Sequence, residues 1–554
     1  MQKKYKTPLV VLLFLLVTQW VVVAASSETA HPVGENIRIP LLPEEYWWGG
    51  LSVDGFHMPF GAESDIRRDL YGNNRGNQAS PILVSSKGRY VWSEAPYRYT
   101  FADGVLTVDQ THDAVFFGRS GDSLQEGYRA VSQKYFPSNG EIPDPLLFTA
   151  PQYNTWIELM YNQNQEDILR YAFAILSNGY PAGVLMIDDN WQTSYGDWTF
   201  RKDRFEDPKQ MITLLKEAGF KIMMWICPFM TADTQNFRYT AAEGLLHLDP
   251  QRTQDILWAN TKNKAAMIRW WNGASAMLDL SNPRARTWFE AQLDHLVDEY
   301  GVDGFKFDAG DTPFYRDEQI ISYDEDSIPN DHTMYFGELG LNYPLNEYRA
   351  SWKMVGLPLA QRLRDKGHNW ADLEQLIPGM LTQGLMGYAY TCPDMIGGGE
   401  YQSFLRQETI DEELIVRSAQ VHALMPMMQF SVAPWRVLSP QNNAICRDMA
   451  NLHAEFGEEI LALAHRSSQT GEPIVKPLAW YWPNQGYETI QDQFILGSDL
   501  LVAPVFEQGA RSRTVRFPEG IWHGDDGSKV VGPATIEIDV PLERLPYYRL
   551  QKDA

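Results

Sequence analysis

Hydrophobic and polar residues alternate in short stretches from about residue 37 to residue 147, separated by Gly, Asp and Asn. The segment GRYVWSEAPYRYTFADGVLTVDQ is an example. Alternation with a period of two is typical of strands that bury one face, and the intervening Gly and Asp predict turns. We therefore expect residues 26–147 to form an N-terminal β-sandwich.

After residue 147 the pattern changes to apolar runs of strand length that alternate with segments of helical period. Helices are predicted at 166–179 and 207–219, since both segments end at a glycine, which commonly terminates a helix. The predicted strands are 154–161, 182–190, 221–229, 275–281, 301–311, 347–354, 387–399 and 427–435. Eight such strands predict an α/β fold, a (β/α)8 TIM barrel over residues 148–470.

Alternation returns near the end of the chain, in QFILGSDLLVAPVFE and PATIEIDVPLERLPYYRL. Residues 471–554 are therefore predicted to be a small C-terminal β-sandwich.

The start of the chain differs from the rest. A cationic MQKKYK precedes an apolar run from Leu9 to Val23, and Ala24, Ala25 and Ser26 fit a cleavage site. We interpret residues 1–25 as a signal peptide, which predicts export to the periplasm or the extracellular space. An uncleaved membrane anchor is the alternative, because the run approaches membrane-spanning length.

Composition and charge narrow the class of partner. The formal net charge of -24 leaves no basic surface for a phosphate backbone, so nucleic acid is not expected. The 18 Trp and 27 Tyr, many beside Asp, Asn or Gly, suit sugar rings. The three cysteines have neither disulfide-framework nor metal-ligand spacing, and no nicotinamide motif occurs. We expect no cofactor and no metal, and a glycan as the partner.

Acidic residues stand at the downstream ends of most predicted barrel strands, where such barrels keep their chemistry. They are Glu158, Asp188, Asp189, Asp279, Asp308 and Asp394. Any one of them alone could be a helix N-cap. Their recurrence at the same end of successive strands favours a catalytic site.

The segment GVDGFKFDAGD at 301–311 gives the clearest indication of a catalytic residue. Alternate residues of a strand share a face, so Lys306 and Asp308 point together toward the barrel mouth. A neighbouring ammonium favours the ionised carboxylate that a nucleophile requires, although a buried structural ion pair would give the same pattern.

An ordered set of motifs resembles glycoside hydrolase family 31 from about residue 154 to residue 505. The motifs are FKFDAGD, VLMIDDNWQTSYGDWTF, WWNG, RDKGHNW, YTCPDMIGGG, LMPMMQFSVAPWR and GEPIVKPLAWYWP with QDQFILGSDLLVAPV. The resemblance implies a β-sandwich, a (β/α)8 barrel and a following β-sandwich. It also implies a retaining mechanism with two carboxyl groups about 5 Å apart.

The resemblance assigns roles to individual residues. Asp308 matches the catalytic nucleophile, and Asp365 in RLRDKGHNW matches the acid/base. Asp188 and Asp394 match sugar-binding acids. The other predicted substrate-binding residues lie within or beside the same motifs: Asp189, Trp191, Trp271, Lys306 and Arg349.

The acid/base assignment depends on the cations around Asp365, since nearby positive charge lowers the pKa of an acid. Arg362, Arg364 and Lys366 are close in sequence. If they do not point away, Asp311 or Asp394 becomes the candidate.

The sugar specificity also has alternatives. Ser431 stands where α-glucosidase members have a histidine, and Cys227-Pro228 replaces their Asp-Pro. The most similar branch is associated with α-galactoside cleavage, so an exo-acting α-galactosidase is favoured. An α-glucosidase, an α-xylosidase or an enzyme acting on an N-acetylated sugar is the alternative within the family. A carbohydrate-binding protein without catalysis is the alternative from another class.

Overall fold

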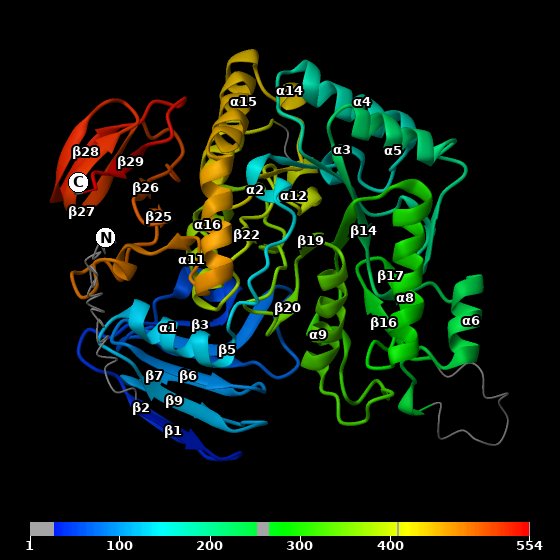
Figure 1. The fold of residues 1–554 in the computed structure, drawn as a ribbon, viewed down its shortest axis with the longest axis horizontal. Coiled ribbons are helices and arrows are strands. Elements are labelled where there is room, and N and C mark those ends of the chain that lie inside the picture. The colour runs from blue at the N-terminus through cyan, green and yellow to red at the C-terminus, as the bar shows by residue number, and fades with distance from the viewer. Residues whose placement is uncertain (1–26, 252–264, 407–408, 553–554) are drawn as a thin grey trace, which may run out of the picture.

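The computed structural model describes residues 27–251, 265–406 and 409–552. N-terminal β-sheets, a parallel barrel with its helices, and a C-terminal sheet follow one another along the chain. In Figure 1 the N-terminal sheets (blue) and the C-terminal sheet (red) lie on the same side of the barrel. The predicted signal peptide falls outside the described residues. No helix within those residues is long and apolar enough to cross a membrane.

The N-terminal domain consists of two sheets with a shared core. One sheet contains β1 (Ser27–His31), β9 (Val115–Arg119), β6 (Arg89–Ser93), β5 (Gln78–Ser85) and β3 (Trp47–Leu51). The other contains β2 (Ile37–Pro40), β8 (Val105–Asp109), β7 (Arg98–Ala102) and β4 (Ile66–Asp69). Alternation in β7 and β8 buries every second residue, as the sequence predicts. The helix α1 (Leu124–Tyr135) packs against β5 and β6.

The barrel is an eight-stranded parallel sheet. Its order is β22 (Thr391–Cys392), β21 (Gln361–Arg362), β19 (Leu345–Tyr348), β18 (Gly304–Phe307), β14 (Lys221–Ile226), β11 (Val184–Ile187), β10 (Gln152–Asn154) and β23 (Gln429–Phe430). A parallel bridge between Ile396 and Phe430 brings the two ends of the sheet together. Strands such as β11 and β14 are almost continuously apolar because both of their faces are buried.

Helices cover the outside of the barrel. The longer ones are α4 (Gln165–Ser177), α5 (Pro208–Glu217), α8 (Pro283–His295), α9 (Pro329–Leu339), α11 (Leu376–Leu385), α13 (Glu412–Ala423), α15 (Pro440–Glu455) and α16 (Gly457–Thr470). Shorter helices lie in the connecting segments: α2 (Leu146–Thr149), α3 (Trp156–Leu159), α6 (Gln235–Glu243), α10 (Trp370–Glu374), α12 (Tyr401–Leu405) and α14 (Pro434–Val437). The predicted helices at 166–179 and 207–219 are α4 and α5, and both are followed by a left-handed glycine.

Two strand predictions in the barrel are wrong. The segment 275–281 pairs in an antiparallel hairpin of β16 (Met267–Trp270) and β17 (Gly273–Met277), with β15 (Phe229–Met230) alongside. The barrel takes β21 in its place. The segment 154–161 turns into α3 after Asn154, so Glu158 lies on that helix and binds Arg436. A separate hairpin, β12 (Gln192–Ser194) and β13 (Asp197–Phe200), follows β11.

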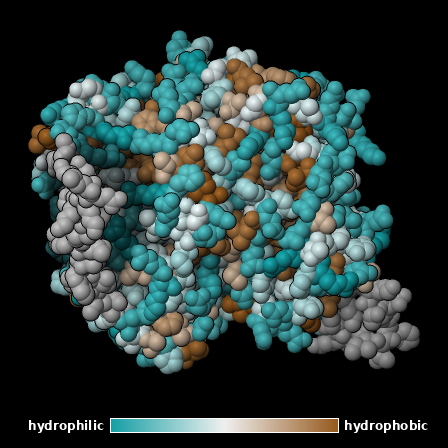
Figure 2. All heavy atoms as spheres, viewed as in Figure 1, coloured by the Kyte–Doolittle hydropathy of each residue, from teal (hydrophilic) through white to brown (hydrophobic). Residues whose placement is uncertain are grey.

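The C-terminal domain is one six-stranded sheet with its own core. Its order is β24 (Val475–Lys476), β25 (Phe494–Leu496), β26 (Leu500–Val502), β29 (Tyr547–Leu550), β27 (Ser512–Gly524) and β28 (Lys529–Asp539). The core includes Leu478, Ile495, Phe517 and Trp522. Figure 2 shows a mostly hydrophilic molecular face on which apolar residues are scattered, as on ordinary protein surfaces.

The N-terminal domain and the barrel are joined at the strand ends. Directly after β19, the short strand β20 (Ser351–Trp352) leaves the barrel and pairs in parallel with β5. The Gln78 side chain donates to the carbonyl oxygens of Arg349 and Arg362, at 2.7 Å each. Asn77 donates to the Arg349 carbonyl at 3.0 Å. These buried amides fix the backbone at the ends of two barrel strands.

Candidate active site

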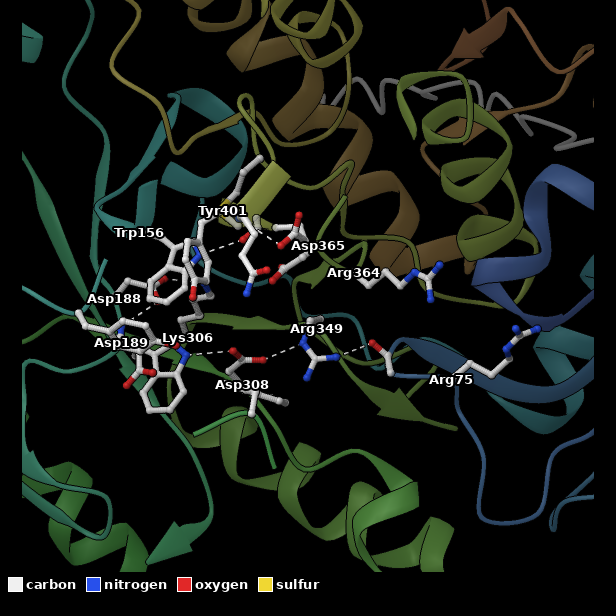
Figure 3. A pocket seen from close by; sticks show the side chains of 18 residues that line it. Arg75, Trp156, Asp188, Asp189, Lys306, Asp308, Arg349, Arg364, Asp365 and Tyr401 are labelled. Atoms are coloured by element: carbon white, nitrogen blue, oxygen red, sulfur yellow. Dashed lines mark hydrogen bonds and ion pairs between the residues drawn. The ribbon is translucent and has the colours of Figure 1, made fainter. Parts of the chain in front are cut away.

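A cavity of about 480 Å³ opens at the carboxyl ends of the barrel strands (Figure 3). Seven of the predicted site residues line it: Asp188, Asp189, Trp271, Lys306, Asp308, Arg349 and Asp365. They come from the ends of β11, β18 and β19, from the β16–β17 turn and from the segment after β21. The volume suits one or two sugar units, within the usual range of small-molecule sites.

Asp308 follows β18 and is held by three donors. Arg349 Nε lies 2.8 Å from Oδ1, the Trp225 indole nitrogen lies 3.0 Å from Oδ2, and the Ala309 amide donates to Oδ1 at 2.9 Å. Phe305 and Phe307 face the other way and pack together, as the alternation in this strand predicts. The carboxylate is therefore fixed in orientation while it still lines the cavity.

The electrostatic surroundings keep Asp308 ionised. Burial alone would raise the pKa of this carboxyl. The positive charges of Arg349, Lys306 and Arg362 outweigh burial and, with the Trp225 hydrogen bond, hold the pKa well below its usual range. An ionised, oriented carboxylate at the cavity wall can act as a nucleophile.

Lys306 binds the acid on the neighbouring side of the cavity. Its Nζ lies 2.6 Å from Asp188 Oδ2, and both side chains are buried. The Asp188 carboxylate also accepts the Asp189 amide at 2.8 Å. Figure 3 shows these three residues together at one end of the cavity. A buried pair of this kind presents both a donor and an acceptor to sugar hydroxyl groups.

Asp189 has an unsatisfied oxygen. Its Oδ2 accepts from Asn272 at 2.6 Å and from Tyr195 at 3.2 Å, while Oδ1 has no partner among the described residues. Burial and the adjacent Asp188 charge raise the pKa of Asp189 to about 7. A hydroxyl group of a bound sugar would satisfy Oδ1.

Asp365 lies on another side of the cavity, in the segment after β21. Arg362 Nη1 donates to its Oδ1 at 2.8 Å, and 43% of the side chain is exposed. The flanking Lys366 side chain turns away and donates to the Met395 carbonyl oxygen. One of the neighbouring cations therefore contacts Asp365, and the condition that all of them point away is not met.

The two alternative acids do not line the cavity. Asp311 is bound by both terminal nitrogens of Arg349, at 3.0 and 2.8 Å. Asp394 is fully buried and accepts from Arg362 at 2.5 Å and from the Lys366 amide at 2.9 Å. Asp365 is the candidate that a leaving group could reach.

Two predicted substrate-binding residues lie behind the cavity wall. Trp191 is fully buried and donates its indole hydrogen to the Trp225 carbonyl oxygen at 2.9 Å. Asp394 holds Arg362 and the backbone of the segment that contains Asp365. Both side chains support residues that line the cavity and do not line it themselves.

Sequence reasoning missed an aromatic wall. The Trp156 ring contacts Tyr161 and Tyr401 edge to face, with centroids 5.3 and 5.5 Å away. Its indole nitrogen donates to the Gly399 carbonyl oxygen at 2.8 Å. These rings and Trp225 line the cavity together with Trp271, at the turn of the β16–β17 hairpin. Aromatic faces of this kind cover the C–H groups of sugars.

His247, Asp279 and His332 form the one group in the described part of the chain whose spacing would suit a metal. The Asp279 oxygens accept from Ser281 and from the Tyr323 amide, and Ser322 Oγ lies between the two imidazoles. All three residues of the group are buried and lie outside the cavity lining. These hydrogen bonds indicate a structural role for the cluster. The spacing of the three residues in the sequence does not reveal that they lie together.

The fold and the carboxylates at the barrel mouth define a protein of the glycoside hydrolase type. The chain belongs to glycoside hydrolase family 31. Residues 147–356 match the family's TIM-barrel domain, and residues 471–551 match its C-terminal domain.

Known relatives agree with this membership, and a solved structure shares the fold. The chain is 32% identical to the myogenesis-regulating glycosidase of Mus musculus over 76% of its own length and 59% of that protein. It is 23% identical to alpha-glucosidase 2 of Bacillus thermoamyloliquefaciens over 76% of this chain and 55% of that enzyme. A Flavobacterium johnsoniae dextranase of the family superposes with a TM-score of 0.79 at 20% identity, covering 93% of this chain and 66% of the other. The chain thus spans little more than half of these curated relatives.

Proposed function

We propose that this protein is a retaining, exo-acting α-glycosidase that favours terminal α-galactosides. The observation that carries the proposal is the Asp308 carboxylate, which lines the cavity while Arg349 and Trp225 hold it oriented and ionised. This is the state that an attacking carboxylate requires.

The reaction would proceed in two displacements. An oxygen of Asp308 attacks the anomeric carbon, the bond from that carbon to the leaving oxygen breaks, and Asp365 gives its proton to the leaving oxygen. Water then attacks the glycosyl-enzyme ester, its proton passes to Asp365, and Asp308 leaves as a carboxylate. Lys306, Asp188 and Asp189 would bind the hydroxyl groups of the sugar being cleaved.

The preference for galactosides rests on the similarity to the branch associated with α-galactoside cleavage. The two positions that depart from α-glucosidase members are buried and outside the cavity lining: Ser431 donates to the Gly398 carbonyl oxygen at 2.8 Å, and Cys227 lies 3.9 Å from the Phe229 carbonyl oxygen. They would affect specificity through the backbone they support. Export through the N-terminal segment is part of the same proposal.

The test is hydrolysis of a panel of aryl α-glycosides by the wild type and by Asp308→Asn. The panel contains the galactoside, glucoside, xyloside and N-acetylgalactosaminide. We expect hydrolysis of the galactoside and a loss of several orders of magnitude in the variant. Preference for another sugar would replace the galactoside proposal. Activity that survives Asp308→Asn would remove this residue as nucleophile, and binding of the glycosides without any turnover would favour a carbohydrate-binding protein.

A further inference from the structure

The charged side chains that line the cavity differ in how closely they are paired with other residues. Each acid has a partner: Lys306 binds Asp188, Asn272 binds Asp189, Arg349 binds Asp308, Arg362 binds Asp365, and backbone amides at the start of α12 bind Glu400. Lys306 and Arg349 are paired in the same way. The remaining cations of the lining are Arg75 and Arg364.

Arg364 is exposed, and within residues 27–251, 265–406 and 409–552 no hydrogen bond or ion pair to its side chain is formed. Its neighbour Asp365 is not its hydrogen-bond partner, since the Asp365 carboxylate accepts from Arg362. An arginine without a carboxylate partner offers five N–H donors to a ligand.

Arg75 is only weakly paired. Its Nη1 lies 3.5 Å from Asp54 Oδ1, and its side chain is 44% exposed. Asp54 already receives two shorter hydrogen bonds from Arg68, at 2.5 and 2.8 Å. The contact is long, and buried Asp54 is bound mainly by Arg68, so the half-exposed guanidinium of Arg75 remains available to a ligand.

Both arginines lie on the leaving-group side. Figure 3 shows Arg75 and Arg364 at the end of the cavity away from Asp188 and Asp189. Arg364 and Asp365 also line a smaller cavity of about 70 Å³, together with Phe56 and Asn77 of the N-terminal domain. The space beyond Asp365 is therefore where the departing part of a substrate would lie.

We infer that the leaving-group side of this site binds an anionic sugar, whose carboxylate or sulfate group is held by Arg364 and Arg75. The inference rests on the proposed function, because Asp365 defines the leaving-group side. A guanidinium matches the planar geometry of a carboxylate and the oxygens of a sulfate ester. The chain has a net charge of -24, which disfavours anions over most of the molecule, so the two arginines on this side of the cavity would have a selective effect.

The kinetic test uses three disaccharides with the same terminal sugar, chosen as the one cleaved in the aryl panel. The second unit is glucose, glucuronic acid or glucose 6-sulfate. We expect the wild type to cleave the charged substrates with a kcat/KM about five- to tenfold higher than the neutral one, mainly through a lower KM. The ratio of kcat/KM for the charged substrates to that for the neutral one should fall toward one in about 0.5 M NaCl. At this salt concentration exposed charges are screened over about a few ångströms.

The variants are Arg364→Gln and Arg75→Gln, with Arg238→Gln as the matched control. Arg238 is an exposed arginine on α6, outside the cavity lining, that bonds the Asp233 carbonyl oxygen. The charged-to-neutral ratio should drop in both site variants, more in Arg364→Gln, and stay unchanged in the control. A wild type without the preference, or an Arg364→Gln variant that keeps it, would overturn the inference.

A binding measurement separates this inference from the proposed function. Calorimetry or saturation-transfer NMR with methyl β-glucuronide, methyl β-glucoside 6-sulfate and methyl β-glucoside requires no turnover. Tighter binding of either charged sugar, lost in Arg364→Gln, supports the anion site even if no glycoside is hydrolysed, and the better charged ligand identifies the group. Equal binding of all three overturns the inference even if the hydrolysis panel succeeds.

Discussion

Arg349 joins two carboxylates at the cavity: its Nε donates to Asp308 at 2.8 Å, and its terminal nitrogens donate to Asp311 at 3.0 and 2.8 Å. Its Nη1 also donates to the Gly76 carbonyl oxygen of the N-terminal domain at 2.5 Å. Asp311 and Gly76 therefore fix the guanidinium that orients Asp308. Lysine could not replace this set of contacts, because an ammonium lacks the planar fork of donors.

The first prediction concerns Arg349→Lys. We expect kcat to fall by about 100-fold, because the shorter lysine side chain cannot bind Asp308 and Asp311 as the guanidinium does. The acidic limb of the kcat/KM profile should also move to higher pH, since the pKa of Asp308 rises as its contact with this positive charge weakens. Arg98→Lys is the control, since Arg98 forms a similar paired contact with Asp109 far from the cavity. An acidic limb at the wild-type pH would contradict the role assigned to Arg349.

The second prediction concerns Asp365→Ala. An acid that protonates the leaving oxygen matters little when the leaving group is already stable as an anion. We expect the first displacement on a dinitrophenyl glycoside to be nearly as fast as in the wild type, whereas cleavage of a disaccharide falls by at least about 100-fold. Burst kinetics on the aryl substrate isolate that step. Equal losses on both substrates would indicate a structural role for Asp365.

The third prediction follows from Asp189. Its pKa is raised from an ordinary value of 3.8 to about 7 in the folded protein, so between those values the folded state binds more protons than the unfolded state. Stability must therefore fall as pH rises through this window. Asp189→Asn cannot titrate, and its Tm relative to the wild type should increase from pH 4 to pH 8, by an amount equivalent to about 4 kcal/mol.

The control for this experiment is Asp326→Asn, at an exposed loop position. Its Tm difference from the wild type should not change appreciably with pH. A difference for Asp189→Asn that is flat between pH 4 and pH 8 would show that Asp189 is an ordinary ionised carboxylate in the folded protein.

The fourth prediction concerns Asp394, a fully buried partner of Arg362. Asp394→Ala leaves the buried guanidinium with less compensation, and we expect a loss of about 3–5 kcal/mol in unfolding free energy. Asp122→Ala removes a highly exposed partner of Arg119 and should cost about 1 kcal/mol or less. Thermal unfolding followed by circular dichroism compares the two, and losses of similar size would contradict the structural role of Asp394.

The sequence predicts the direction of side chains at a strand end well where apolar and polar residues alternate clearly. The alternation in 304–308 correctly places Lys306 and Asp308 on the same face. It fails at β21, a two-residue strand of Gln361 and Arg362, because no apolar period exists in so short a polar segment. The segment 275–281 has a strand pattern, but its partner is β16, and the Asn272-Gly273 pair is the hairpin signal that was available.

The aromatic and basic residues of the cavity wall are harder to predict than the acids at the strand ends. Trp156, Tyr401 and Arg364 come from segments far apart in the chain, and no local period brings them together. Conversely, Trp191 and Asp394 belong to the motifs that the sequence analysis used, but their side chains are buried behind the residues that line the cavity. A motif locates a segment, while the direction of each side chain depends on the tertiary contacts around it.

The amides of Asn77 and Gln78 have a consequence for how this protein can be divided. A fragment of residues 148–470 would contain Asp308 and Asp365 but would lack the donors to the carbonyl oxygens of Arg349 and Arg362, and the Gly76 acceptor as well. Such a fragment would contain both carboxylates but would lack the contacts that hold Arg349 and Arg362, the arginines that bind them. The geometry of the proposed catalytic site therefore depends on the N-terminal domain as well as on the barrel, and exchanging that domain for another would be expected to alter activity.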